Sequence, residues 1–266
     1  MSIRKIDFIQ TNANSRKIFP MNKGTEQEIE HALRLHAQNF CAPIWWESER
    51  KTVVNNGTMC VVRTPTSVLG ITNDHVLEIY QQHKIEKPDI FCQLGSAPFD
   101  PNANLIARSK FWDLATFTIP AFTLQHWGRK VLLARIWPPS PIQTTDHVVF
   151  GGFVEARRTV PPVPFPPTMS VPFVSFRKQP HSSTENQVIF HIEPSQVTWL
   201  PNVESPLQPG TNLSGMSGGP CFRLVPAENR IELGGIIYEG DYDLGIIFAR
   251  QICLVSAQGQ IAPPST

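Results

Sequence analysis

The chain has 266 residues, of which 41% are hydrophobic and 17% charged, and this composition is globular and excludes a disordered protein. Its 23 basic and 22 acidic residues leave a net charge of +1, which argues against nucleic acid or an acidic membrane surface as a partner. No apolar run suggests a signal peptide or approaches the roughly 20 residues of a membrane span, so we expect a cytoplasmic protein.

The N-terminal part, residues 1–45, is predicted to be an irregular arm followed by a helix. Thr25 and Glu28 form a capping box at the start of this helix. Apolar residues at helical spacing then form one stripe, made of Ile29, Ala32, Leu33, Ala37 and Phe40. The stripe favours docking of the helix on the body of the protein over binding of a partner.

Beyond about residue 50 the chain consists of short apolar runs separated by Pro, Gly and Asn. The runs cover residues 59–62, 67–71, 90–94, 114–119, 148–150, 188–192, 233–237 and 244–248. Many short runs of this kind predict an all-β barrel or sandwich. A short turn of helix is expected over 74–83.

Two proline-containing stretches divide this region. The first, 126–144, is predicted to connect two halves, residues 46–125 and 145–266. The second, 159–172, is predicted to be an extended surface loop, with a proline-ligand motif as the alternative.

The five cysteines are an odd number without a CxxC pair: Cys41, Cys60, Cys92, Cys221 and Cys253. This pattern predicts buried free thiols in a reducing compartment. No Cys or His falls at the spacing of zinc ligands, so we expect no metal and no other cofactor.

The strongest motif lies at 212–220, NLSGMSGGP. Glycines around Ser217 permit a tight loop whose N–H groups point inward. The N–H groups of Gly215 and Ser217 are predicted to form an oxyanion hole for a tetrahedral intermediate. The alternative is a glycine-rich hairpin with a solvated serine.

A nucleophilic serine needs a base and a carboxylate that orients the base. His75 follows an apolar run and a short polar turn, as expected of a histidine presented at a barrel rim. Asp113 heads the apolar run 114–119, where burial of a carboxylate requires a partner. Asp146, in a turn, is the weaker candidate for the carboxylate.

The order His75, Asp113, Ser217 resembles that of the chymotrypsin-like superfamily. In detail the chain is similar to the disulfide-free bacterial branch, which includes the HtrA-like proteases. The resemblance covers roughly residues 52–256. Residues 70–76 match the segment that leads to the histidine, and residues 113–115 match the segment at the aspartate. Residues 56–62 match the first strand of a first barrel, and residues 148–153 match a strand of a second barrel.

The resemblance implies two six-stranded antiparallel β-barrels with the site between them. The first barrel would carry His75 and Asp113, and the second would carry Ser217. The implied substrate-binding residues are Thr211 at the base of the S1 pocket, Asn212, Ser214, and the wall Ile237, Tyr238, Glu239 and Gly240. A neutral pocket floor favours a neutral or small apolar substrate side chain, although Glu239, Asp241 and Asp243 could restore a preference for a basic one.

The chain also departs from the family pattern. Met216 stands where digestive trypsins carry an aspartate that pairs with a new N-terminus, and no internal Ile-Val-Gly-Gly start exists. The oxyanion loop must therefore be ordered by its own packing, by a partner or by substrate. Val76 stands where a disulfide partner of Cys60 would be, which favours a reduced protein. No PDZ-like domain is expected after the catalytic unit.

These features predict a serine endopeptidase that cleaves a polypeptide substrate through an acyl-enzyme on Ser217. An activating protein partner is one way to order the oxyanion loop, and the helix at 25–40 is the part that would meet it. The alternative is a binding or regulatory module that kept the protease fold without turnover.

Overall fold

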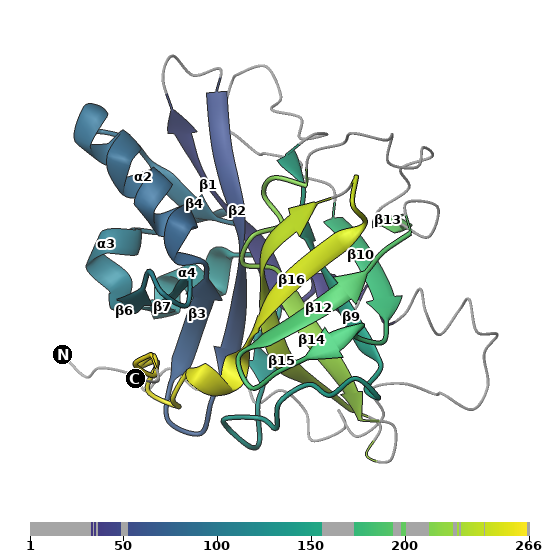
Figure 1. The fold of residues 1–266 in the computed structure, drawn as a ribbon. Helices are drawn as coiled ribbons and strands as arrows, with labels where there is room; N and C mark the ends of the chain where they lie inside the picture. The colour runs from purple at the N-terminus through teal and green to yellow at the C-terminus, as the bar shows by residue number, and fades with distance from the viewer. Residues whose placement is uncertain are drawn as a thin grey trace.

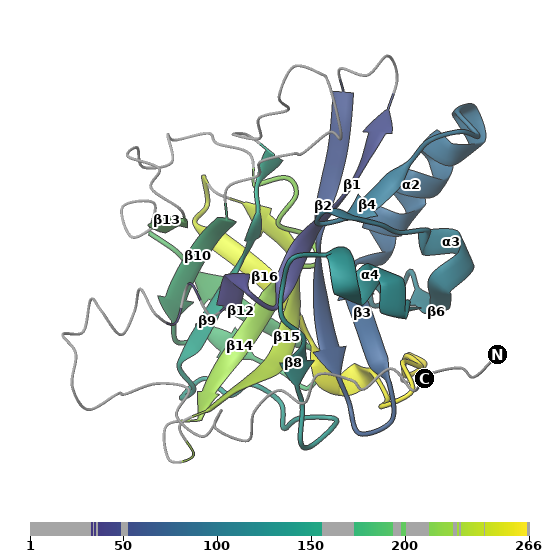
Figure 2. The same ribbon diagram turned by 180° about the vertical axis from the view of Figure 1, so that it is seen from behind.

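The computed structural model describes residues 33, 35, 37–48, 53–155, 173–193, 198–200, 213–225, 228, 230–241 and 243–264. Within these residues the chain forms two separate sheets of eight strands each (Figure 1 and Figure 2). The predicted all-β class with two antiparallel halves is confirmed. Each half has more than the six expected strands, because two- and three-residue pairings join the longer ones.

The first sheet has the order β5-β4-β1-β2-β3-β7-β6, with β8 paired in parallel to β2 and every other pair antiparallel. Its strands are β1 (Cys41–Ser48), β2 (Val53–Arg63), β3 (Val68–Thr72), β4 (Cys92–Leu94), β5 (Ala97–Pro98), β6 (Leu105–Ser109), β7 (Leu114–Thr118) and β8 (Leu132–Leu133).

Four of these strands lie where the sequence predicted none: β1, β5, β6 and β8, of which β1 and β8 bear on the predicted boundaries. β1 begins inside the predicted N-terminal arm, so the segment 56–62 belongs to the second strand of the sheet and not to the first. β8 lies inside the predicted connection 126–144. Both strands are added to the sheet by pairing with β2, which is a long-range contact that a local pattern does not reveal.

Three helices cover the side of the first sheet that faces away from the second sheet (Figure 1 and Figure 2). They are α2 (Asp74–Glu86), α3 (Pro101–Asn104) and α4 (Ala121–His126). α2 is a 13-residue helix and thus longer than the short turn expected over 74–83. It buries Val76, Leu77 and Tyr80 against the sheet.

The second sheet is entirely antiparallel, with the order β11-β12-β16-β15-β14-β9-β10-β13. Its strands are β9 (Val148–Phe153), β10 (Phe173–Lys178), β11 (Ser182–Ser183), β12 (Gln187–His191), β13 (Thr198–Leu200), β14 (Pro220–Val225), β15 (Arg230–Asp241) and β16 (Ile246–Gln251). The proline-rich segment predicted as a loop at 159–172 lies outside the described residues.

A shared core joins the two sheets. It contains Cys60 and Leu69 from the first sheet and Phe222 and Leu233 from the second. Three members of the predicted helical stripe, Leu33, Ala37 and Phe40, are buried in the same cluster. Docking of this segment on the body is therefore confirmed for these three residues, while the capping box, Ile29 and Ala32 lie outside the described residues.

The C-terminal segment returns from the second sheet to the first. After β16 a short 3-10 helix, η4 (Ile252–Leu254), leads into residues that bond to the first half. Trp112 Nε1 donates to the Ala262 carbonyl at 2.8 Å, and Thr116 Oγ1 donates to the Gly259 carbonyl at 2.6 Å. The predicted second half, 145–266, thus includes a tail that packs on the first half.

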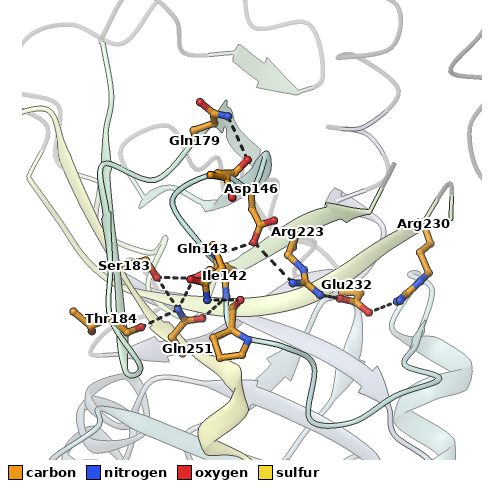
Figure 3. Close-up of polar contacts among 12 residues, drawn as sticks. Ile142, Gln143, Asp146, Gln179, Ser183, Thr184, Arg223, Arg230, Glu232 and Gln251 are labelled. Atoms are coloured by element: carbon orange, nitrogen blue, oxygen red, sulfur yellow. Dashed lines mark hydrogen bonds and ion pairs between the residues drawn. The ribbon is translucent and has the colours of Figure 1, made fainter. Parts of the chain in front are cut away.

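The connection between the halves is fastened to the second sheet by one buried glutamine (Figure 3). Gln251 is fully buried, and its Oε1 accepts the Ile142 N–H at 2.9 Å. Its Nε2 donates to the Ile142 carbonyl at 3.0 Å, to Ser183 Oγ at 3.1 Å and to the Thr184 carbonyl at 3.2 Å. One side chain therefore satisfies both backbone groups of Ile142.

Gln251→Leu is expected to lower the free energy of unfolding by about 1–3 kcal/mol, because it leaves the buried Ile142 N–H without its acceptor, while the Ile142 carbonyl keeps its bond from Ser183 Oγ. Urea unfolding of the variant and of wild type measures the difference. The matched control is Gln179→Leu, since Gln179 is exposed and makes one 3.3 Å bond to the Thr145 carbonyl. Equal losses in both variants would contradict the assigned role of Gln251.

A second polar group in the same region links β14 and β15 (Figure 3). Glu232 accepts hydrogen bonds from Arg223 and from Arg230, and Arg223 Nη1 lies 3.9 Å from Asp146 Oδ2. Asp146 Oδ2 also accepts the Gln143 N–H at 2.8 Å. Asp146 therefore has its partners in the second sheet and in the connection.

All five cysteines are free thiols, and four of them are buried while Cys253 is half-buried. Burial raises the pKa of the Cys60 and Cys221 thiols well above their ordinary value, which keeps both neutral. The prediction of free, mostly buried thiols is confirmed. Among the described residues, no helix has the length and apolar character needed to cross a membrane.

Candidate active site

His75 and Asp113 form the best-defined polar pair of the site. His75 lies in the first turn of α2, directly after the end of β3, and Asp113 directly precedes β7, which pairs with β3. His75 Nδ1 lies 2.7 Å from Asp113 Oδ2, and the His75 backbone N–H donates to Asp113 Oδ1 at 2.9 Å. One carboxylate thus holds both the ring and the backbone of the histidine, and the Nε2 atom stays free of this pair.

The backbone around Asp113 is held in an unusual conformation. Asp113 has a φ of 51°, the only positive φ of a non-glycine residue in the described part of the chain. Asn73 Nδ2 donates to the Asp113 carbonyl at 2.8 Å, and Arg250 Nε donates to the preceding carbonyl, that of Trp112, at 2.9 Å. Contacts of this kind are needed to keep the backbone of a non-glycine residue in the left-handed conformation.

A buried ion pair anchors the residue before His75. The side chain of Asp74 is 2% exposed, and it accepts from Arg108 Nε at 2.6 Å and from Arg108 Nη2 at 2.9 Å. Arg108 Nη1 donates to Gln81 Oε1 at 2.8 Å, about two turns further along α2. The hydrogen bonds to Asp74 raise the pKa of Arg108. Arg108 on β6 therefore fixes the start of α2, where His75 lies.

Ser217 lies in a tight loop between the end of the undescribed segment and β14. Gly215 has a φ of +90° and Gly218 a φ of +88°, conformations that favour glycine. Ser217 is half-buried. Within the described residues, neither the Gly215 N–H nor the Ser217 N–H donates to a protein acceptor. The loop therefore offers two backbone donors, as an oxyanion hole requires.

Contacts at Gly57 bring the Ser217 loop to the His75 side of the first sheet. A Cβ atom on Gly57 would lie 2.7 Å from Val76 Cγ1 and 3.4 Å from the Ser217 carbonyl oxygen. A Cβ atom on Gly218 would lie 2.2 Å from Thr72 Oγ1, at the end of the strand that leads to His75. No hydrogen bond joins the Ser217 side chain to His75 among the described residues.

The predicted substrate-binding residues are distributed unevenly. Thr211 and Asn212 lie outside the described residues, whereas the Ser214 carbonyl accepts the Glu155 N–H at 2.7 Å. The Ile237 side chain is buried, and its N–H and carbonyl bond at 2.8 Å to Gly219 and Gly218 respectively. The backbone of Ile237 thus supports the Ser217 loop, which the sequence analysis did not foresee.

The rest of the predicted wall continues from Ile237 along β15. Tyr238 is half-buried and sits at a bulge in the pairing of β15 with β16. The Arg250 guanidinium lies 4.4 Å from the centre of its ring, and Gln187 Nε2 donates to its hydroxyl. Burial raises the pKa of Tyr238 above its ordinary value. Glu239 and Gly240 are exposed.

Sequence reasoning missed several residues that support the site: Asn73, Asp74, Arg108, Arg250 and Thr58. Two of them gave a signal, since Asn73 and Asp74 are the polar residues between an apolar strand and His75. The others gave none, because Arg108 acts across 34 residues and Arg250 across 138.

The Ser217 loop and the His75–Asp113 pair lie on the same side of the first sheet and together form the candidate active site. The sequence itself matches no protein-family model and no curated protein. The structure is similar to solved structures of proteases.

One similar structure is the active form of a protease from M. tuberculosis, at 15% identity and a TM-score of 0.40, covering 88% of this chain and 85% of that one. A thermostable serine protease from an extremophilic microorganism has 10% identity and a TM-score of 0.43, with 81% and 93% covered. A human pathogenic astrovirus serine protease has 10% identity and a TM-score of 0.39, with 79% and 89% covered. The similarity to the disulfide-free bacterial branch stays a prediction from the sequence.

Proposed function

We propose that the protein is a serine endopeptidase with Ser217 as nucleophile, His75 as general base and Asp113 as the group that orients His75. The observation that carries this proposal is the pair of contacts between the Asp113 carboxylate and His75, one to the ring Nδ1 at 2.7 Å and one from the backbone N–H at 2.9 Å. A carboxylate on Nδ1 leaves Nε2 as the nitrogen that accepts a proton.

In this proposal Ser217 Oγ attacks the carbonyl carbon of a peptide bond while His75 Nε2 takes the hydroxyl proton. The N–H groups of Gly215 and Ser217 donate to the oxyanion. His75 then protonates the leaving amine, the C–N bond breaks and an acyl-enzyme remains. Water, deprotonated by His75, attacks the acyl carbon. The ester C–O bond then breaks, His75 returns the proton to Ser217 Oγ, and the acid product leaves.

The proposal for the substrate rests on the residue types at the predicted S1 pocket. Thr211 would form a neutral floor of the S1 pocket, which favours a neutral or small apolar side chain before the scissile bond. The exposed Glu239 and Asp241 on β15 are the groups that would instead attract a basic side chain. An activating protein partner remains part of the proposal only if the oxyanion loop is not held by the protein itself.

One observation favours the alternative of a silent binding module, namely the missing hydrogen bond between Ser217 and His75 among the described residues. Against it, nucleophile and base of unliganded proteases often come within bonding distance only in the substrate complex. The histidine, the aspartate and the serine are also all present, whereas a degenerate protease is expected to have lost at least one of them.

Digestion of an unfolded protein, such as reduced and alkylated casein, tests the proposal. Wild type is expected to release peptides that mass spectrometry identifies, with one residue class enriched before the cut. Ser217→Ala is expected to release none above background. Equal release by both proteins, or none by wild type at high enzyme concentration and long incubation, would refute endopeptidase activity of the isolated chain.

A further inference from the structure

The loop 213–219 needs an anchor that the sequence does not show. The residue before Ser217 is Met216, whose side chain is apolar and buried in the core of the second sheet, so no ion pair to a free N-terminus can form there. Gly215 and Gly218 both have positive φ, and glycine loses much conformational freedom when it is fixed. A loop of this kind takes one orientation only if hydrogen bonds hold its peptide groups.

Thr58 supplies such bonds from the opposite half of the molecule. It is a fully buried residue of β2, in the first sheet. Its N–H donates to the Ser217 carbonyl at 2.8 Å, and its hydroxyl donates to the Gly215 carbonyl at 2.8 Å. The same hydroxyl accepts the Phe153 N–H at 2.9 Å. Since a hydroxyl has one proton, the Phe153 bond leaves that proton for Gly215.

The surrounding contacts make this arrangement rigid. Thr72 Oγ1 donates to the Thr58 carbonyl at 2.6 Å, which fixes Thr58 within the first sheet. The Glu155 N–H donates to the Ser214 carbonyl at 2.7 Å. A Cβ atom on Gly218 would lie 1.8 Å from the Thr58 carbonyl oxygen, so loop and strand are in close contact.

These bonds determine where the Gly215 N–H points. The Glu155 bond fixes the peptide that joins Ser214 to Gly215, and the Thr58 hydroxyl bond fixes the peptide that follows. A peptide group is planar, with its N–H and carbonyl on opposite sides. The Ser214 carbonyl, held by Glu155, therefore directs the Gly215 N–H of the same peptide away from Glu155. The Gly215 carbonyl, held by Thr58, fixes the orientation of the next peptide relative to it.

We propose that Thr58 is a positioning residue: its hydroxyl holds the loop 213–219 in the orientation that leaves the Gly215 and Ser217 N–H groups for the oxyanion, so that neither cleavage of the chain nor a partner is needed to order the loop. The proposal rests on the proposed function of Ser217. In this proposal a side chain of the first half, that of Thr58, orders a loop of the second half, residues 213–219.

The test compares Thr58→Val, which keeps the shape and removes the hydroxyl, with Thr58→Ser, which restores it. Loss of one oxyanion donor costs about 10²–10³-fold in kcat, and a loosened donor is expected to cost about 10- to 100-fold. Thr58→Val should therefore lower kcat per titrated active site by about that factor with KM nearly unchanged, and Thr58→Ser should recover most of it. The control is Thr116→Val, which removes another buried hydroxyl that bonds to Gly259 at 2.6 Å, away from the loop.

Hydrogen exchange gives a readout that needs no activity. The N–H groups of Met216, Gly218 and Gly219 are bonded within or beside the loop and are expected to exchange faster in Thr58→Val, but not in Thr58→Ser or Thr116→Val. Unchanged exchange, or a kcat per active site equal to that of wild type, would overturn the role of Thr58. A wild type without turnover would refute the proposed function alone, and exchange would still decide whether Thr58 orders the loop.

Discussion

Asp113→Asn is expected to lower kcat by about 10⁴-fold while the fold persists. Both oxygens of Asp113 accept from His75, one from the ring and one from the backbone. An asparagine has one acceptor oxygen for these two donors, and its amide N–H groups favour the ring tautomer with Nδ1 as acceptor. That tautomer carries its proton on Nε2, where it cannot take the serine proton. The measurement is kcat for a peptide substrate, with thermal unfolding to show that the variant folds.

The matched control is Asp146→Asn, the other aspartate that the sequence offered for this role. Asp146 accepts from Gln143 at 2.8 Å and lies 3.9 Å from Arg223, in contact with the second sheet (Figure 3). We expect its kcat to equal that of wild type. A loss below tenfold in Asp113→Asn, or equal losses in both variants, would contradict the assigned role of Asp113.

Arg108→Ala is expected to lower the free energy of unfolding by about 3–5 kcal/mol, because it leaves the Asp74 carboxylate buried without its partner. The side chain of Asp74 is 2% exposed, and two of its bonds come from Arg108, at 2.6 and 2.9 Å. Since α2 starts at Asp74 and carries His75 next, activity is expected to fall as well. Urea unfolding measures the loss in stability.

Two further variants separate the buried charge from the lost packing of Arg108. Arg108→Ala combined with Asp74→Asn removes the uncompensated charge and should recover a large part of the stability. Lys110→Ala removes an ion pair to Glu78 that is largely exposed, and it is expected to unfold near the wild-type midpoint. A double variant no more stable than Arg108→Ala alone would show that the charge is not the cause.

The three residues of the proposed triad could be predicted from the sequence because each has a local signal. Ser217 is flanked by glycines, His75 follows an apolar strand and a polar turn, and Asp113 heads another apolar strand. The structure then pairs His75 with Asp113, as the β3–β7 pairing requires. The local sequence pattern was sufficient to propose a site residue wherever a strand end or flanking glycines determine the position of that residue.

The supporting residues could not be read from the sequence because their partners are distant along the chain. Thr58 bonds to Gly215 across 157 residues, and Arg250 bonds to Trp112 across 138. β1 was also missed, because the helical stripe appeared to continue to Phe40 and Pro43 is unusual in a strand. Its pairing partner β2 is what makes residues 41–48 a strand.

The central claim is that Ser217 is an activated nucleophile, and labelling with a fluorophosphonate probe, read by intact mass, tests it most directly. A serine reacts quickly with this probe only when a base and an oxyanion hole activate it. Wild type is expected to gain one adduct, Ser217→Ala none, and Asp146→Asn one at the wild-type rate. An unlabelled wild type, or an adduct retained in Ser217→Ala, would contradict the claim that Ser217 is the nucleophile of an assembled triad.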